Sequence, residues 1–143
     1  MDTKRKIIFI ILISLVFLQP FLSMRNFSVS TDELTHLPSG YSYWKTGEMK
    51  LNPQHPPLVK LLASFPLLFM RLNFDRNDSY LIGAKSDEWK FGAKLLFSNN
   101  ADNMILWGRI MMILLSVVLA FYIFKWASEM FSVDAGLFAL FLY

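Results

Sequence analysis

Three apolar stretches punctuate the chain, at Ile7–Leu22, Met104–Trp126 and Ala135–Tyr143. A helix needs about 20 apolar residues to cross the hydrocarbon core of a bilayer. The first two stretches approach or exceed that length, whereas the third stops at Tyr143 in mid-span. The pattern therefore predicts two transmembrane helices plus the start of a third. We expect the chain to be the N-terminal part of a longer protein.

The segment 26–103 between these stretches is polar and carries most of the charge and both histidines. Lys4, Arg5 and Lys6 precede the first apolar stretch, and the positive-inside rule assigns them to the cytoplasm. The predicted organisation is a cytoplasmic N-terminus with the first transmembrane helix (1–25), an extracytoplasmic loop (26–103), a second transmembrane helix (104–126), and a cytoplasmic turn with the start of a third helix (127–143). This is an all-α, multi-pass protein of the cell membrane.

A cleaved signal peptide is the alternative interpretation of the first apolar stretch. It requires small residues at the first and third positions before the cleavage point. Phe21 stands two residues before Ser23, so the pair is missing and a retained signal-anchor helix is favoured.

Two helices are predicted in the first half of the loop. Ser30 and Glu33 match the S/T-x-x-E capping box, so one helix begins here, and Pro38 is expected to shorten or kink it. A second helix is expected from Leu58 to Leu72, after Pro56-Pro57 and with a kink near Pro66.

The second predicted helix is amphipathic. Most of its leucines and phenylalanines share one arc, whereas Lys60, Ser64 and Arg71 fall opposite. Such a helix beside membrane spans is expected to lie in the lipid interface. A third helix is predicted from Ser86 to Asn99-Asn100, with a shared face formed by Trp89, Ala93, Leu96 and Phe97.

Composition narrows the classes of function. The chain is 55% hydrophobic and contains no cysteine, which excludes disulfides and thiolate metal sites. A net charge of +3 without a Lys/Arg run interleaved with aromatics favours contact with anionic lipid over nucleic acid. The lipid bilayer is therefore the expected partner, and no nucleic acid is expected.

Asp32 and Glu33 are candidates for acid–base chemistry, because they follow the first predicted span closely. A partly desolvated carboxylate at the membrane surface can act as a general base. Adjacent helical residues diverge by about 100°, so one carboxylate is expected to be catalytic and the other supporting. The alternative is that both favour the helix N-terminus through capping and the dipole.

The remaining candidates are cationic, imidazole or aromatic. His36 lies four residues after Asp32 and could join His55 in a zinc site, although no metal-binding spacing is present and structural histidines are the alternative. Lys60 and Arg109 could bind a lipid phosphate, or could snorkel to the interface. The aromatic residues Tyr41, Tyr43, Trp44 and Trp89 could stack on sugar rings, or could anchor the chain at the interface.

The ordered motifs resemble a known family. They are Thr31-Asp32-Glu33-Leu34-Thr35-His36, then Gly40-Tyr41-Ser42-Tyr43-Trp44, then Leu51-Asn52-Pro53-Gln54-His55-Pro56-Pro57-Leu58-Val59-Lys60-Leu61-Leu62. Over nearly the whole chain the pattern resembles the N-terminal part of GT-C fold glycosyltransferases, in the protein O-mannosyltransferase and aminoarabinose-transferase group. Pro38 and Gln54 depart from that pattern.

The resemblance implies an enzyme that transfers a sugar, with inversion, from a polyprenyl-phosphate carrier to a protein, lipid or glycan acceptor at the outer membrane face. It implies Asp32 as the base with Glu33 as companion, and His55, Lys60 and Arg109 near the donor phosphate. Sugar or acceptor contacts would come from His36, Tyr41, Tyr43 and Trp44. No metal or other cofactor is implied, and the 143 residues alone are not expected to be active. A non-catalytic membrane protein that keeps the loop for partner or lipid binding is the alternative.

Overall fold

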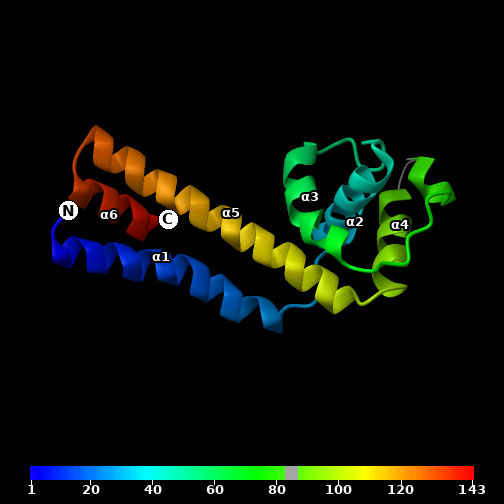
Figure 1. Cartoon of the computed structure of the whole chain (residues 1–143), viewed down its shortest axis with the longest axis horizontal. Coiled ribbons are helices and arrows are strands. Elements are labelled where there is room, and N and C mark those ends of the chain that lie inside the picture. Colours follow the sequence, from blue (N-terminus) through cyan, green and yellow to red (C-terminus); the bar gives the residue numbers. More distant parts are fainter. Residues whose placement is uncertain (83–86) are drawn as a thin grey trace. The chain divides into compact units, whose positions relative to one another are not determined.

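The computed structural model describes residues 1–82 and 87–143, and within these ranges the chain forms helices and no strand. The helices are α1 (Thr3–Ser23), η1 (Met24–Asn26), α2 (Thr31–Thr46), α3 (Pro57–Ser64), η2 (Phe65–Phe69), η3 (Ser79–Ile82), α4 (Asp87–Phe97), α5 (Ala101–Met130) and α6 (Val133–Leu142) (Figure 1). The predicted all-α fold is confirmed. The chain divides into two compact units, one of residues 1–26 and 112–143 and one of residues 27–111.

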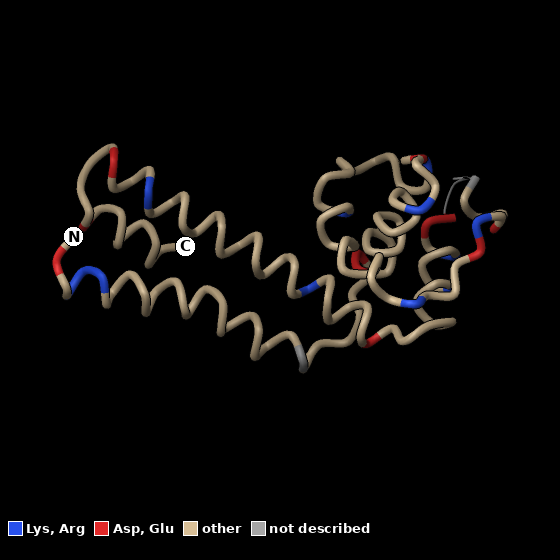
Figure 2. Tube along the Cα trace, viewed as in Figure 1, with Lys and Arg blue, Asp and Glu red and all other residues tan. Residues whose placement is uncertain are grey.

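The first unit contains α1 and the part of α5 from Met112 onward. With 21 residues in α1 and 30 in the whole of α5, both helices are long and apolar enough to cross a membrane. Their charged residues lie near the helix ends, and the central turns carry none (Figure 2). In α1, Pro20 is accommodated within the last turn, and no residue of the helix is buried.

The connection after α5 is shorter than predicted. We expected a turn over 127–134, but α5 continues to Met130 and α6 begins at Val133. Ser132 accounts for the early start of α6, because its side chain accepts a hydrogen bond from the Ala135 backbone and caps the helix. α6 lies alongside α1, where Arg5 donates two hydrogen bonds to Asp134, at 2.8 and 2.6 Å.

The second unit is built around α2, which lies between α3 and α4 (Figure 1). The predicted capping box is confirmed: the Ser30 hydroxyl accepts from Glu33 N at 3.2 Å, and the Glu33 carboxylate accepts from Ser30 N at 2.8 Å. The expectation that Pro38 shortens this helix is wrong, since α2 continues to Thr46. Pro38 cannot donate to the Leu34 carbonyl, and that carbonyl lies against Gly92 of α4.

The core of the second unit combines side chains from α2, α4, the start of α5 and the segments between them. Its buried apolar members are Leu37, Tyr41, Tyr43, Leu51, Leu67, Phe91, Leu95, Leu96, Met104 and Ile105. The first turns of α5 thus belong to this core, and Gly108 faces Leu37 and the Ala63 carbonyl of α3.

The predicted helix over 58–72 is wrong in extent, because α3 ends at Ser64 and a 3-10 turn continues to Phe69. Pro66 explains the change, since it has no N–H to donate and its ring clashes with the carbonyl one turn earlier. The helix is two-faced as predicted, but its polar face is turned inward. Lys60 and Ser64 are 3% and 0% exposed, whereas Leu58 and Phe69 are 66% and 79% exposed.

The face predicted for the third helix is only partly buried, since Leu96 is covered and Trp89 is 38% exposed. α4 buries Phe91, Gly92, Leu95 and Leu96, and leaves Phe97 exposed. Gly92 decides this orientation, because a Cβ there would overlap the Leu34 carbonyl oxygen of α2. The predicted start at Ser86 lies outside the described residues, and the predicted end is confirmed, since Asn99 Nδ2 donates to the Leu95 carbonyl at 2.8 Å.

Candidate active site

The two adjacent carboxylates at the start of α2 have different surroundings. Glu33 receives hydrogen bonds from Arg109, Nε to Oε1 at 2.5 Å and Nη2 to Oε2 at 2.8 Å. Arg109 also donates to the carbonyls of Phe27 and Ser28, at 2.9 and 2.8 Å. Asp32 remains exposed, and the described part of the chain gives its carboxylate no hydrogen bond. Glu33 therefore ties α2 to α5, and Asp32 is available to a ligand.

The electrostatic surroundings of Glu33 also make it a poor candidate for the catalytic base. Partial burial acts to raise the pKa of Glu33, but hydrogen bonds from Arg109 and from the Ser30 backbone outweigh it, and the pKa lies below its ordinary value. A carboxylate with a lowered pKa is a weaker base. Its contacts suit a fixed anion that holds Arg109.

His36 and His55 are brought together from α2 and from the loop before α3. Their ring centroids are 4.9 Å apart, and the rings meet edge to face at 80°. His36 Nδ1 is buried without a hydrogen-bond partner among the described residues. The pair lies on the α2 face that also carries Asp32, one helical turn earlier.

His36 is expected to titrate below the ordinary histidine value of about 6.5. Burial lowers the pKa of His36, as do the charges of Lys60 and His55, while Asp32 opposes them. Because the unfolded chain then binds more protons, this site loses stability as the pH falls below about 6.5 toward the folded-state pKa. An NMR titration of the intact chain, with His36→Gln used to assign the signal, measures this directly. A midpoint at or above 6.5 would contradict the burial of the ring.

Lys60 forms the centre of a buried polar network. Its Nζ donates to Asn52 O and Asn52 Oδ1, each at 2.5 Å, and to His55 O at 2.9 Å. The Tyr43 hydroxyl donates to Asn52 O at 3.1 Å and accepts from Asn52 N at 3.2 Å. Burial lowers the pKa of Lys60, against the opposing charge of Glu88. The network fixes the 52–55 loop, and with it His55, beside α2.

The three aromatic candidates on α2 divide by exposure. Tyr41 is buried and packs edge to face on Phe74, with ring centroids 5.5 Å apart. Tyr43 is buried by the network around Lys60. Trp44 has an exposed ring, and its Nε1 donates to the Leu61 carbonyl at 3.0 Å. Of these three, Trp44 alone presents a ring surface that a sugar or lipid could contact.

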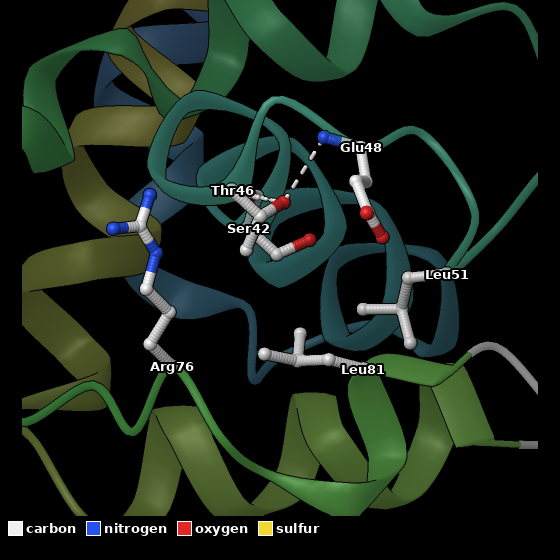
Figure 3. Close-up of a pocket in the computed structure, with 6 residues that line it drawn as sticks. All are labelled: Ser42, Thr46, Glu48, Leu51, Arg76 and Leu81. Carbon is white, nitrogen blue, oxygen red and sulfur yellow. Dashed lines mark hydrogen bonds between the residues drawn. The ribbon is translucent and has the colours of Figure 1, made fainter.

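A separate pocket of about 280 Å³ opens near the C-terminal end of α2 (Figure 3). Its lining consists of Ser42, Thr46, Glu48, Leu51, Arg76 and Leu81. Both hydroxyls have protein partners, since Ser42 donates to Ser39 O and Thr46 donates to Ser42 O. Arg76 donates to the Lys45 carbonyl at 2.6 Å. None of the residues predicted to be functional lines this pocket.

Sequence reasoning missed the role of Asn52 and the Glu33–Arg109 pair. Asn52 lies next to Pro53, in a segment whose prolines predict the start of a helix. No local pattern indicates that the Asn52 carbonyl accepts a hydrogen bond from a buried lysine. Glu33 and Arg109 are far apart in sequence, so helical spacing carries no signal of their contact. An arginine in an apolar stretch that is predicted to span a membrane does indicate a need for a partner, and the acidic residues of the predicted loop were the available choices.

Within residues 1–82 and 87–143, no group of three potential metal ligands is placed to hold an ion. Comparisons of the chain with protein-family models, curated proteins and solved structures found no match.

Proposed function

We propose that this chain is the acceptor-side part of a multi-pass membrane glycosyltransferase that uses a polyprenyl-phosphate sugar. The N-terminus is cytoplasmic in this proposal, and the second unit lies on the extracytoplasmic side. Support for the topology comes from the Arg5–Asp134 contact, which links the beginning of α1 to the beginning of α6. A chain with two complete spans before α6 has both of these points on one side of the membrane.

The observation that carries the proposal is the division of roles in the first turn of α2. Glu33 is held by Arg109 and by the cap, whereas Asp32, the adjacent residue, has an exposed carboxylate. A transferase needs one unencumbered base positioned on a rigid element. The capping box and the Arg109 contact supply the rigidity.

The proposed chemistry needs only a base and a good leaving group. The acceptor hydroxyl oxygen attacks C1 of the sugar while Asp32 accepts its proton. The bond between C1 and the phosphate oxygen breaks, and its electron pair leaves on the polyprenyl phosphate. Attack from the face opposite the phosphate inverts the configuration at C1. His36 follows Asp32 by one turn on the same face of α2, and the His36–His55 pair would contact the sugar or the acceptor.

One observation favours a second candidate, a non-catalytic membrane protein that retains the loop fold. Lys60 and Arg109, the cations proposed for the donor phosphate, are both engaged by protein groups. If those contacts persist with donor bound, the leaving phosphate must be stabilised by other cations of the complete protein.

The donor class separates the two candidates. Membranes from cells expressing the native gene are incubated with radiolabelled polyprenyl-phosphate mannose or aminoarabinose, and in parallel with the matching nucleotide sugars. We expect label to reach an endogenous acceptor from a lipid-linked donor, and no transfer in membranes lacking the gene. Transfer from nucleotide sugars alone would contradict the proposal, and transfer from neither class would favour the non-catalytic protein.

A further inference from the structure

The pocket near the C-terminal end of α2 has no part in the proposed transfer reaction. Arg76 and Glu48 lie on opposite sides of this pocket, with the two lining hydroxyl groups between them (Figure 3). We propose that the pocket binds a small zwitterion, an α-amino acid with an apolar side chain. The carboxylate of this ligand lies at Arg76, its ammonium group at Glu48, and its side chain at the two leucines of the lining.

The walls of the pocket come from three segments of the second unit that hydrogen bonds hold together. Glu48 N donates to Thr46 Oγ1 at 3.1 Å, which fixes the turn after Gly47 to the end of α2. Arg76 Nη2 donates to the Lys45 carbonyl at 2.6 Å, which ties the third segment to the same helix end. The volume of about 280 Å³ lies just below the range of about 300–1,000 Å³ that is usual for ligand pockets, so the ligand must be small.

Arg76 brings a positive charge to one side of the pocket. Among the described residues, its guanidinium contacts a backbone carbonyl and forms no ion pair with a carboxylate. The acids closest to it in sequence are engaged elsewhere, since Asp75 accepts from Asn77 N at 2.9 Å and Asp78 pairs with Lys94 at 2.5 Å. The other N–H groups of Arg76 can therefore bind a ligand carboxylate, with the two parallel hydrogen bonds that arginine favours.

The opposite side of the pocket offers hydrogen-bond acceptors. Ser42 and Thr46 donate their hydroxyl hydrogens to backbone carbonyls, at 2.7 and 2.8 Å, so their oxygens can only accept from a ligand. Glu48 pairs through Oε2 with Lys50 at 3.0 Å, and its Oε1 has no partner among the described residues. A positively charged group with several N–H donors fits these acceptors, and an ammonium group has both properties.

The apolar part of the lining belongs to the core of the second unit. Leu51 is a buried member of that core, and Leu81 packs against it. An apolar ligand side chain is therefore favoured beside these leucines. A neutral saccharide fits less well, because its hydroxyl groups leave the charge of Arg76 without a counter-ion.

The inference goes beyond the proposed function and does not depend on transferase activity. The test follows the backbone amide signals of the isotopically labelled intact chain in detergent micelles by NMR while L-leucine is added. The titration is repeated with L-leucinamide, which lacks the carboxylate, and with isocaproate, which lacks the ammonium group. Methyl mannoside is the saccharide probe. Arg76→Gln and Glu48→Gln each remove one charge, and Arg71→Gln is the matched control, since Arg71 is exposed and lies outside the lining.

We expect L-leucine to shift the signals of residues 46–51 and 76–81 saturably, and Arg71→Gln to bind it as the wild type does. Each analogue and each variant of Arg76 or Glu48 should bind about tenfold more weakly or worse, because one charge-assisted contact is lost. Equal binding of L-leucinamide and L-leucine to the wild type would overturn the inference without relying on any substitution. Shifts with methyl mannoside alone would overturn it in favour of a saccharide. No shift with L-leucine would overturn it and leave the proposed function standing.

Discussion

Replacing Lys60 with methionine is expected to lower the free energy of unfolding of the second unit by about 3 kcal/mol. Methionine fills a similar volume but donates nothing to Asn52 O, Asn52 Oδ1 or His55 O. A buried acceptor left without its donor costs about 1–3 kcal/mol. Asn52 Oδ1 and His55 O both lose the lysine donor, whereas Asn52 O keeps the Tyr43 hydroxyl. Loss of the lysine charge removes its desolvation cost, which keeps the total near the lower end of that sum.

Two measurements on the protein in detergent micelles test this expectation. The midpoint of thermal unfolding should fall, and amide hydrogen exchange should accelerate at residues 51–56, which the lysine holds. Lys50→Met is the matched control, since Lys50 is exposed and pairs only with Glu48 at 3.0 Å among the described contacts. Unchanged exchange at 51–56 in Lys60→Met would show that the network does not fix the loop.

Replacing Gly40 with alanine is expected to lower the free energy of unfolding of the second unit by about 1–3 kcal/mol or more. In Gly40→Ala the added carbon would overlap the Lys60 carbonyl oxygen and lie 2.6 Å from Ser64 Oγ. Backbone cannot yield as a flexible side chain can, so α3 must move away from α2. That movement would also disturb the Lys60 network, because the overlapped carbonyl belongs to Lys60 itself.

Gly47→Asn provides the comparison for Gly40→Ala. Gly47 has φ +77° at the end of α2 and nothing within 4 Å of an added Cβ. Asparagine tolerates the left-handed conformation better than most residues, so this variant should lose little stability. Equal midpoints of thermal unfolding for the two variants would contradict the close packing of α3 on α2.

Local signals predicted the elements that depend on local chemistry. The capping box at Ser30 and Glu33 fixed the start of α2, and the apolar lengths indicated both long helices, since each feature is complete within a few turns. The divergence of Asp32 and Glu33 also followed from helical geometry alone. These features could be predicted without knowing which other helices pack against them.

Tertiary packing determined which faces of α3 and α4 are buried, and local sequence patterns did not predict this. The inward faces of α3 and α4 were set by Gly40 and Gly92, where a missing side chain admits a neighbouring backbone carbonyl. Periodicity shows which residues share a face, but not which face is covered. The burial of Lys60 depended likewise on acceptors eight and five residues earlier in a non-helical loop.

The most direct test of the central claim is the transfer rate of Asp32→Asn in the protein expressed from its native gene. General-base catalysis contributes about 10²–10⁴-fold, so we expect a rate loss in that range with little change in KM for the lipid-linked donor. Asp102→Asn is the matched control, because Asp102 is also an exposed acid in the first turn of a helix. The transfer rate of Asp102→Asn should stay within about twofold of wild type. Loss of the base in Asp32→Asn should lower the rate well beyond that. Asp32→Asn that transfers sugar as fast as Asp102→Asn would contradict the role of Asp32 as the base.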